Sequence, residues 1–197
     1  MGPTEWLLNH EIDAMMYLFT EMTTLRRWEP SKVAFMSCMF SNQMKTSFEE
    51  FQKDKKKFKV SELLHRYDIG ELPVLGRTRL MWDLDVTCMY VPLNVGKHWI
   101  SMCVNFFSQS IEVFDCEGLK HNKEVEPFAF LIPRIVKSVH SSKSRQQLKV
   151  EQYTVSYTPM PYLLNKSNSD CGVYALKHIE CHYLGLEFSL VNDNNIR

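Results

Sequence analysis

No part of this sequence is apolar for the roughly 20 consecutive residues that a membrane-spanning helix needs. The one apolar candidate near the N-terminus is interrupted by Glu5, Glu11 and Asp13, which a secretory signal would not tolerate. Neither sign of charge is in excess, since 23 Lys and Arg residues balance 23 Asp and Glu residues. Nothing in the composition therefore predicts a nucleic acid or a membrane surface as a partner.

The six cysteines form no CxxC pair and no regular framework. A chain of 197 residues that is 45% hydrophobic can build a core without disulfide bonds. We therefore expect reduced thiols and an intracellular protein, in the nucleus or the cytoplasm. Internal repeats are also lacking. Residues 1–197 are expected to form one monomeric domain, whether or not they belong to a longer chain.

Hydrophobic periodicity predicts the secondary structure. Helices are expected over residues 5–27, 46–67 and 125–140, and from Cys171 onward. Strands are expected over Val33–Met36, Val86–Leu93, Trp99–Phe106, Ile111–Asp115 and Lys149–Thr158. Helices segregated from a run of antiparallel strands are typical of an α+β domain.

A cysteine stands at the predicted start of the last helix. Asp170 is a suitable N-cap, so Cys171 falls in the first helical turn. The helix dipole and the free N–H groups favour the thiolate there, which is the nucleophilic form. Gly172 leaves room for another chain to approach the sulfur closely. The ordinary alternative is a buried core cysteine, but an upstream His and Asp favour a nucleophile.

A cysteine nucleophile needs a base and a group that orients the base. His98 and Asp115 belong to one predicted hairpin. If Phe106 faces Ile111, Asp115 stands opposite Met102. That position is four residues from His98, or about 13 Å along the strand. A bulge, a bend or a different register must close this gap, so the hairpin alone does not establish a His–Asp pair.

A structural zinc site is the competing chemical interpretation. Its candidate ligands are Cys171, His178, Cys181 and His182, and the two histidines lie one helical turn apart. Structural zinc usually takes two paired sets of ligands, and a second pair is lacking. We therefore expect neither a metal nor a cofactor.

The same residues resemble those of a known family, the SUMO/sentrin-type cysteine proteases of ubiquitin-like modifiers. The similar motifs are His98-Trp99, Asp115 after the next strand, and Asp170-Cys171-Gly172 at a helix start. Further similarity covers most of the chain, in Trp6-Leu7-Leu8-Asn9, Val33-Ala34-Phe35 and Met89-Tyr90-Val91-Pro92. The sequence resembles divergent plant-type members more than the well-known desumoylases.

The resemblance implies a papain-like α+β fold, with a central and mainly antiparallel sheet packed between helices. It implies a cysteine-type peptidase or isopeptidase that cleaves after the diglycine tail of a SUMO-like modifier, or of its conjugates, through a thioester. Cys171 would be the nucleophile, His98 the base and then the acid, and Asp115 the residue that orients His98. The residues implied to bind the modifier are Trp6, Trp99, Asn9 and Gly172.

Two positions depart from the family pattern. Asn165 stands six residues before the nucleophile, where the family has a Gln that donates to the oxyanion. Asn carries the same donor on a shorter arm, so it can serve only if its loop lies further inward. Leu8-Asn9 replaces the usual Asn-Asp. The alternative is thus a catalytically impaired relative that binds a modifier or partner without turnover.

Overall fold

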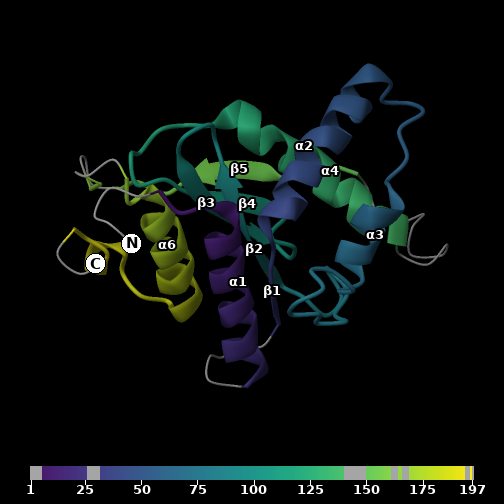
Figure 1. Cartoon of the computed structure of the whole chain (residues 1–197). Coiled ribbons are helices and arrows are strands. Elements are labelled where there is room, and N and C mark those ends of the chain that lie inside the picture. The colour runs from purple at the N-terminus through teal and green to yellow at the C-terminus, as the bar shows by residue number, and fades with distance from the viewer. Residues whose placement is uncertain are drawn as a thin grey trace.

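The computed structural model describes residues 6–25, 32–139, 150–160, 164–165, 169–193 and 196. Its elements, in chain order, are α1 (Asn9–Thr24), β1 (Val33–Phe35), α2 (Cys38–Lys53), α3 (Glu62–Asp68), β2 (Cys88–Asn94), β3 (Trp99–Asn105), β4 (Ser110–Phe114), α4 (Asn122–Val139), β5 (Thr154–Tyr157), α6 (Cys171–Leu184) and the 3₁₀ turn η1 (Phe188–Leu190) (Figure 1). Within the described segments, no helix combines the length and hydrophobicity needed to cross a membrane.

The five strands form one mixed sheet in the order β1-β2-β3-β4-β5. The three central strands are antiparallel, as predicted. Each edge strand pairs in parallel with its neighbour, which strand patterns alone did not indicate. The strand β2 continues past Pro92, because β1 has already ended there and the missing N–H leaves no partner unsatisfied.

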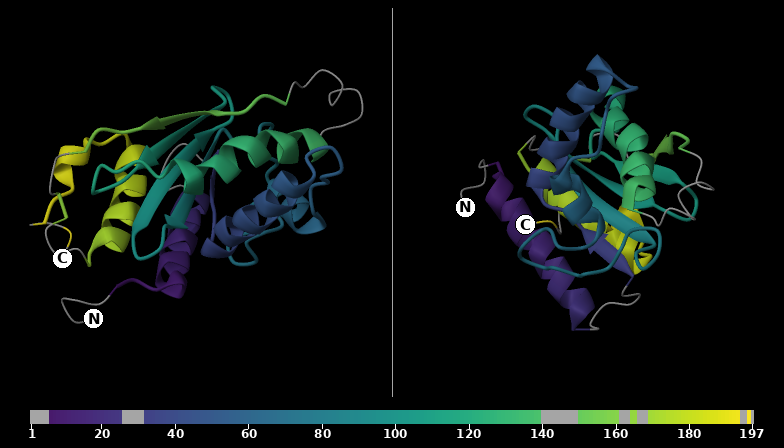
Figure 2. Two further views of the ribbon diagram at one scale, coloured as in Figure 1. Left: turned by 90° about the horizontal axis from the view of Figure 1, so that it is seen from above. Right: turned by 90° about the vertical axis from the view of Figure 1, so that its right-hand side faces the viewer.

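Alternating side chains of the sheet supply two hydrophobic cores, one on each face. Ile100, Met102 and Val104 of β3 face the core formed with α2, α3 and α4. Trp99 and Cys103 face the opposite core, formed with α1 and α6 (Figure 2). The helix α6, which begins at the candidate nucleophile, is therefore packed directly on the central strand.

Three predicted helices have different bounds in the structure. The helix expected over 125–140 is α4, which begins three residues earlier, at Asn122. The first helix begins at Asn9 rather than near residue 5, because the N-cap Leu8 donates its backbone N–H to Glu11 at 2.7 Å. The stretch predicted as one helix over 46–67 is two helices, α2, which begins already at Cys38, and α3. Between them Asp54 accepts two backbone N–H groups in a turn, and Ser61 caps the start of α3.

The β3–β4 hairpin has a different register from the one considered above. Val104, and not Phe106, pairs with Ile111, because residues 106–109 form the connecting loop. Continued by one pair, this register places Asp115 opposite Ile100 rather than Met102. The gap to the level of His98 shrinks from four residues to two, or about 7 Å. The register itself therefore closes half of the gap.

Candidate active site

The candidate nucleophile, Cys171, is the first residue of α6. Asp170 occupies the N-cap position, but it makes no side-chain capping hydrogen bond, contrary to the prediction. The backbone N–H of Trp99 donates to the sulfur at 3.4 Å, which joins the start of β3 to the start of α6. The exposed fraction of Cys171 is 0%. An acyl group can therefore reach the sulfur only after neighbouring side chains move.

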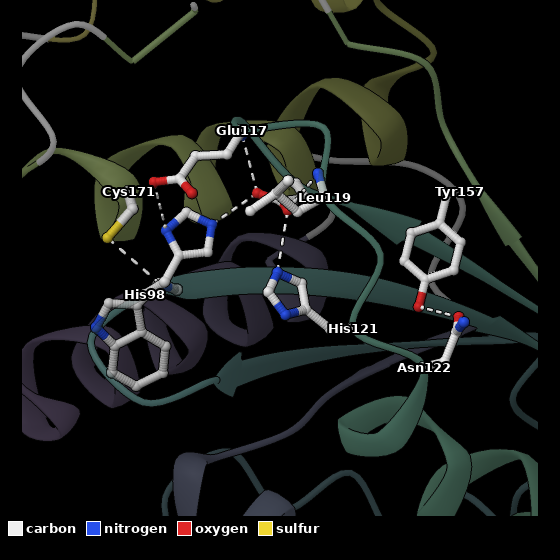
Figure 3. Close-up of polar contacts among 9 residues, drawn as sticks. His98, Glu117, Leu119, His121, Asn122, Tyr157 and Cys171 are labelled. Atoms are coloured by element: carbon white, nitrogen blue, oxygen red, sulfur yellow. Dashed lines mark hydrogen bonds and ion pairs between the residues drawn. The ribbon is translucent and has the colours of Figure 1, made fainter.

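The imidazole of His98 lies between a carboxylate and the sulfur. Its Nε2 is 2.6 Å from Oδ1 of Asp115, just beyond the end of β4 (Figure 3). Its Nδ1 is 3.4 Å from a carboxylate oxygen of Glu117. Cys171 is also a hydrogen-bond partner of this ring. Three residues that are far apart in sequence thus meet in the order sulfur, imidazole, carboxylate, which is the order needed for proton transfer from a nucleophile.

The Asp115 carboxylate is held by four donors. Besides His98, it accepts the backbone N–H groups of Glu117 at 2.9 Å and Leu119 at 3.0 Å. A second imidazole, His121, lies 3.2 Å from Oδ2. Burial raises the pKa of Asp115, but these hydrogen bonds and the adjacent imidazoles outweigh burial and lower its pKa overall. The group therefore stays ionised and can hold a charged imidazole.

His98 is stabilised in its protonated form. Burial lowers the pKa of His98, but the hydrogen bonds to Asp115 and Cys171 and the negative charges of Asp115 and Glu117 raise it to about 10. Because this pKa lies above the ordinary value, the charged ring contributes stability that is complete below about pH 6.5 and is lost as the pH rises toward 10.

Replacing Glu117 by glutamine is expected to lower the pKa of His98, because a negative charge near the ring disappears while the size of the side chain is kept. The alkaline limb of the kcat/KM profile should then move to lower pH, by up to about one unit for this partly exposed carboxylate. The measurement is hydrolysis of a modifier conjugate between pH 6 and 11. As a control, Glu71→Gln should leave the profile unchanged. An unchanged pH profile in the Glu117→Gln variant would show that the Glu117 charge does not raise the pKa of His98.

The predicted modifier-binding residues gather around the N-terminal segment. Trp99 is buried, and its indole N–H donates to the carbonyl of Leu7 at 3.0 Å. Trp6 is 40% exposed, and Asn9 is exposed at the start of α1. The space beside Gly172 is taken by Leu7 of this chain, not left open for another chain: a Cβ at Gly172 would lie 2.9 Å from the Leu7 Cβ.

Gly172→Ala is expected to destabilise the fold by about 1–3 kcal/mol, because the added methyl group meets the buried side of Leu7. Urea unfolding of the parent and the variant would measure the loss. Leu7→Gly removes all three obstructing side-chain atoms, Cβ included, so in the double variant the penalty of Gly172→Ala should largely disappear. An equal penalty in both backgrounds would show that Leu7 is not its cause.

Asn165 is buried and lies beside Cys116. Burial raises the pKa of the Cys116 thiol, and a hydrogen bond with Asn165 partly offsets this effect. Since Cys116 follows Asp115 directly, Asn165 lies in the neighbourhood of the candidate site. Its role as an oxyanion donor stays a prediction.

The zinc interpretation of α6 is wrong for these residues. Cys171 and Cys181 are ten residues apart on one helix, which is about 15 Å at 1.5 Å per residue. His182 Nδ1 is hydrogen-bonded to the Tyr90 hydroxyl at 2.7 Å. His178 is fully buried, and burial lowers its pKa to about 4. In the part of the chain that the structure describes, these four side chains do not meet at one point.

Glu117 and His121 were missed by sequence reasoning. They stand two and six residues after Asp115, in the connection between β4 and α4. No periodicity operates in such a connection, so their spacing carried no signal. The one available hint was the chemistry of the stretch, which places an acid and an imidazole close behind an aspartate.

Sequence comparison agrees with this geometry. Residues 5–197 match the Ulp1 protease family, C-terminal catalytic domain. The chain belongs to this family. It is therefore a domain of the cysteine peptidase class, and none of the curated proteins matches it in sequence.

Several solved protease structures share the fold. A de-sumoylating protease superposes with a TM-score of 0.59 at 17% identity, over 92% of this chain and 64% of that one. The Ulp1-like SUMO protease domain of Chaetomium thermophilum gives 0.59 at 14% identity, over 93% and 64%. The C-terminal Ulp1 domain in complex with Smt3, the yeast ortholog of SUMO, gives 0.52 at 13% identity, over 95% and 70%. At such identities the likeness establishes the α+β fold, and this chain spans about two thirds of the length of those structures.

Proposed function

We propose that this Ulp1-family domain is a cysteine peptidase that cleaves after the diglycine tail of a SUMO-like modifier. The observation that carries the proposal is the His98–Asp115 pair, 2.6 Å apart, placed beside the sulfur at the start of α6. In this mechanism the one proton shared by the Cys171–His98 pair resides on His98 before the attack, and the sulfur of Cys171 attacks the carbonyl carbon of the last glycine. His98 then protonates the leaving amine, and water hydrolyses the thioester to restore the free thiol.

The choice of substrate rests on the relatives. A Ulp1 protease domain of the same fold was solved with Smt3 bound, and another protease of this fold is described as de-sumoylating. Buried Trp99 links the sulfur to Leu7, because its backbone N–H donates to Cys171 and its indole N–H donates to the Leu7 carbonyl. A diglycine tail lacks side chains, so it suits a narrow channel that must open before the tail can reach a fully buried sulfur.

A panel of modifiers with a C-terminal electrophile tests the proposal. We expect a covalent adduct of one modifier per chain with a SUMO-type probe, mapped to Cys171 by mass spectrometry, and release of the amine from a matching fluorogenic conjugate. Ubiquitin carrying the same electrophile on the same diglycine tail is the control for recognition of the rest of the modifier. An adduct on another cysteine, or no adduct with any diglycine modifier, would overturn the proposal.

The second candidate is a domain that binds a modifier without turnover, which the full burial of Cys171 favours. Asn165→Gln separates the two. If the family's longer donor arm is what this chain lacks, the substitution should raise kcat at least tenfold and by up to about 10²–10³-fold, the effect of one oxyanion donor. The control Asn165→Asp removes the amide donor and should not raise kcat. Unchanged modifier affinity without turnover in all three proteins would support the binding domain.

A further inference from the structure

The loop after β4 adds a second imidazole to the candidate catalytic pair. His98 and His121 both direct Nε2 at the Asp115 carboxylate, at 2.6 Å from Oδ1 and 3.2 Å from Oδ2. The three ligand atoms lie within 4.8 Å of one another. Two imidazoles and a carboxylate are the ligand set of an open zinc site, which keeps its fourth position for water.

We propose that His98, Asp115 and His121 form a Zn²⁺ site, and that zinc bound there reversibly switches the peptidase off. Tetrahedral zinc at 2.0–2.1 Å from each ligand sets its ligand atoms about 3.3 Å apart. The spacing of His121 Nε2 and Asp115 Oδ2, 3.2 Å, already matches this value. The His98 contact of 2.6 Å is to the other carboxylate oxygen, Oδ1, so the His98 ring must move to bring all three ligand atoms, which now lie within 4.8 Å of one another, to tetrahedral spacing.

The surroundings of the three ligands favour a metal as well. A zinc-binding histidine commonly donates its second ring N–H to a carboxylate, which fixes the ring. Here Nδ1 of His98 lies 3.4 Å from Glu117. The backbone N–H groups of Glu117 and Leu119 hold Asp115 in place. The His98 and His121 side chains are 12% and 18% exposed, so an ion can enter from solvent while the sulfur stays covered.

Zinc at this position would stop proton transfer without touching the sulfur. It replaces the proton on Nε2 of His98 and takes the carboxylate that the imidazolium needs. The ring is then fixed and can neither accept the thiol proton nor carry a positive charge. Imidazole ligands favour Zn²⁺ over Mg²⁺ and Ca²⁺, which prefer oxygen, so the switch should distinguish these ions. The regulatory consequence rests on the proposed function, whereas the binding of zinc does not.

Calorimetry on the intact chain with Cys171→Ala tests the site without the thiol. We expect one Zn²⁺ per chain and no heat from Mg²⁺. Adding His121→Gln should weaken zinc binding at least tenfold, whereas His10→Gln, an exposed histidine on α1, should not. In the active chain, zinc should inhibit and EDTA should restore turnover. The inhibition constant, measured relative to each protein's own zinc-free rate, should rise at least tenfold with His121→Gln.

Each outcome has a distinct meaning. Zinc that binds only when Cys171 is present would place the ion on the sulfur and overturn the inference. Equal affinity in the His121→Gln variant would overturn it too. A chain that binds zinc through His121 but never turns over a modifier conjugate would leave the metal site standing and would refute the proposed function instead.

Discussion

Cys171→Ala is expected to abolish hydrolysis of a SUMO-type conjugate, with a loss of about 10⁶-fold in kcat as for other enzymes that lose their nucleophile. The sulfur is the one group at the start of α6 that can form the acyl intermediate. Because alanine is smaller than cysteine and this position is fully buried, the fold should keep most of its stability. The measurements are steady-state turnover and labelling with the modifier–electrophile probe, and both should fall to background.

Cys181→Ala is the matched control, since Cys181 is also buried on α6. It should keep turnover close to that of the parent. Binding of a non-cleavable modifier conjugate should survive in Cys171→Ala, because the tail would be held by other residues. If the variant retained more than one thousandth of the parent turnover, the nucleophile would have to be sought elsewhere.

Part of this candidate site could be predicted from the sequence, because the position of a residue within a helix depends only on local sequence patterns. An N-terminal helical position for Cys171 follows from the apolar repeat of α6 and needs no tertiary information. The pairing of His98 with Asp115 needed a register, and a register depends on where a hairpin turns. The turn lies at residues 106–109, where Phe106 leaves the ladder to stack on Trp82 with ring centroids 5.7 Å apart. That contact is tertiary, so strand alternation could not reveal it.

Other differences between the predicted and the observed structure also come from contacts that hydrophobic periodicity does not describe. The break between α2 and α3 depends on Asp54 and Ser61, whose side chains bond to the backbone in place of helical hydrogen bonds. The parallel pairing of the edge strands β1 and β5 depends on the paths by which long connecting segments return to the sheet. Leu7 against Gly172, and His121 against Asp115, are contacts between segments with no periodic relation. Patterns thus predicted the elements and the nucleophile, while the closure of the site came from packing.

Asp115→Asn is expected to lower kcat by about 10⁴-fold, the scale seen when the orienting carboxylate of a catalytic triad is replaced by its amide. The carboxylate accepts from donors on both oxygens. An amide has one acceptor and one donor, so its NH₂ group must face either the Glu117 N–H and His98 or the Leu119 N–H and His121. The substitution also removes the negative charge of Asp115, which raises the pKa of His98, so the imidazolium is lost at a lower pH.

The measurements are kcat and its pH dependence, together with urea unfolding. In the Asn variant the amide NH₂ group faces N–H donors that no longer have an acceptor, which should lower the free energy of unfolding by about 1–3 kcal/mol. Asp54→Asn is the control, because Asp54 pairs with Lys57 on the exposed surface at 3.7 Å and lies outside the site. The decisive comparison is between rate and stability. A variant that loses stability but keeps kcat within tenfold of the parent would make Asp115 a structural hub of the β4–α4 loop rather than the partner of a catalytic imidazole.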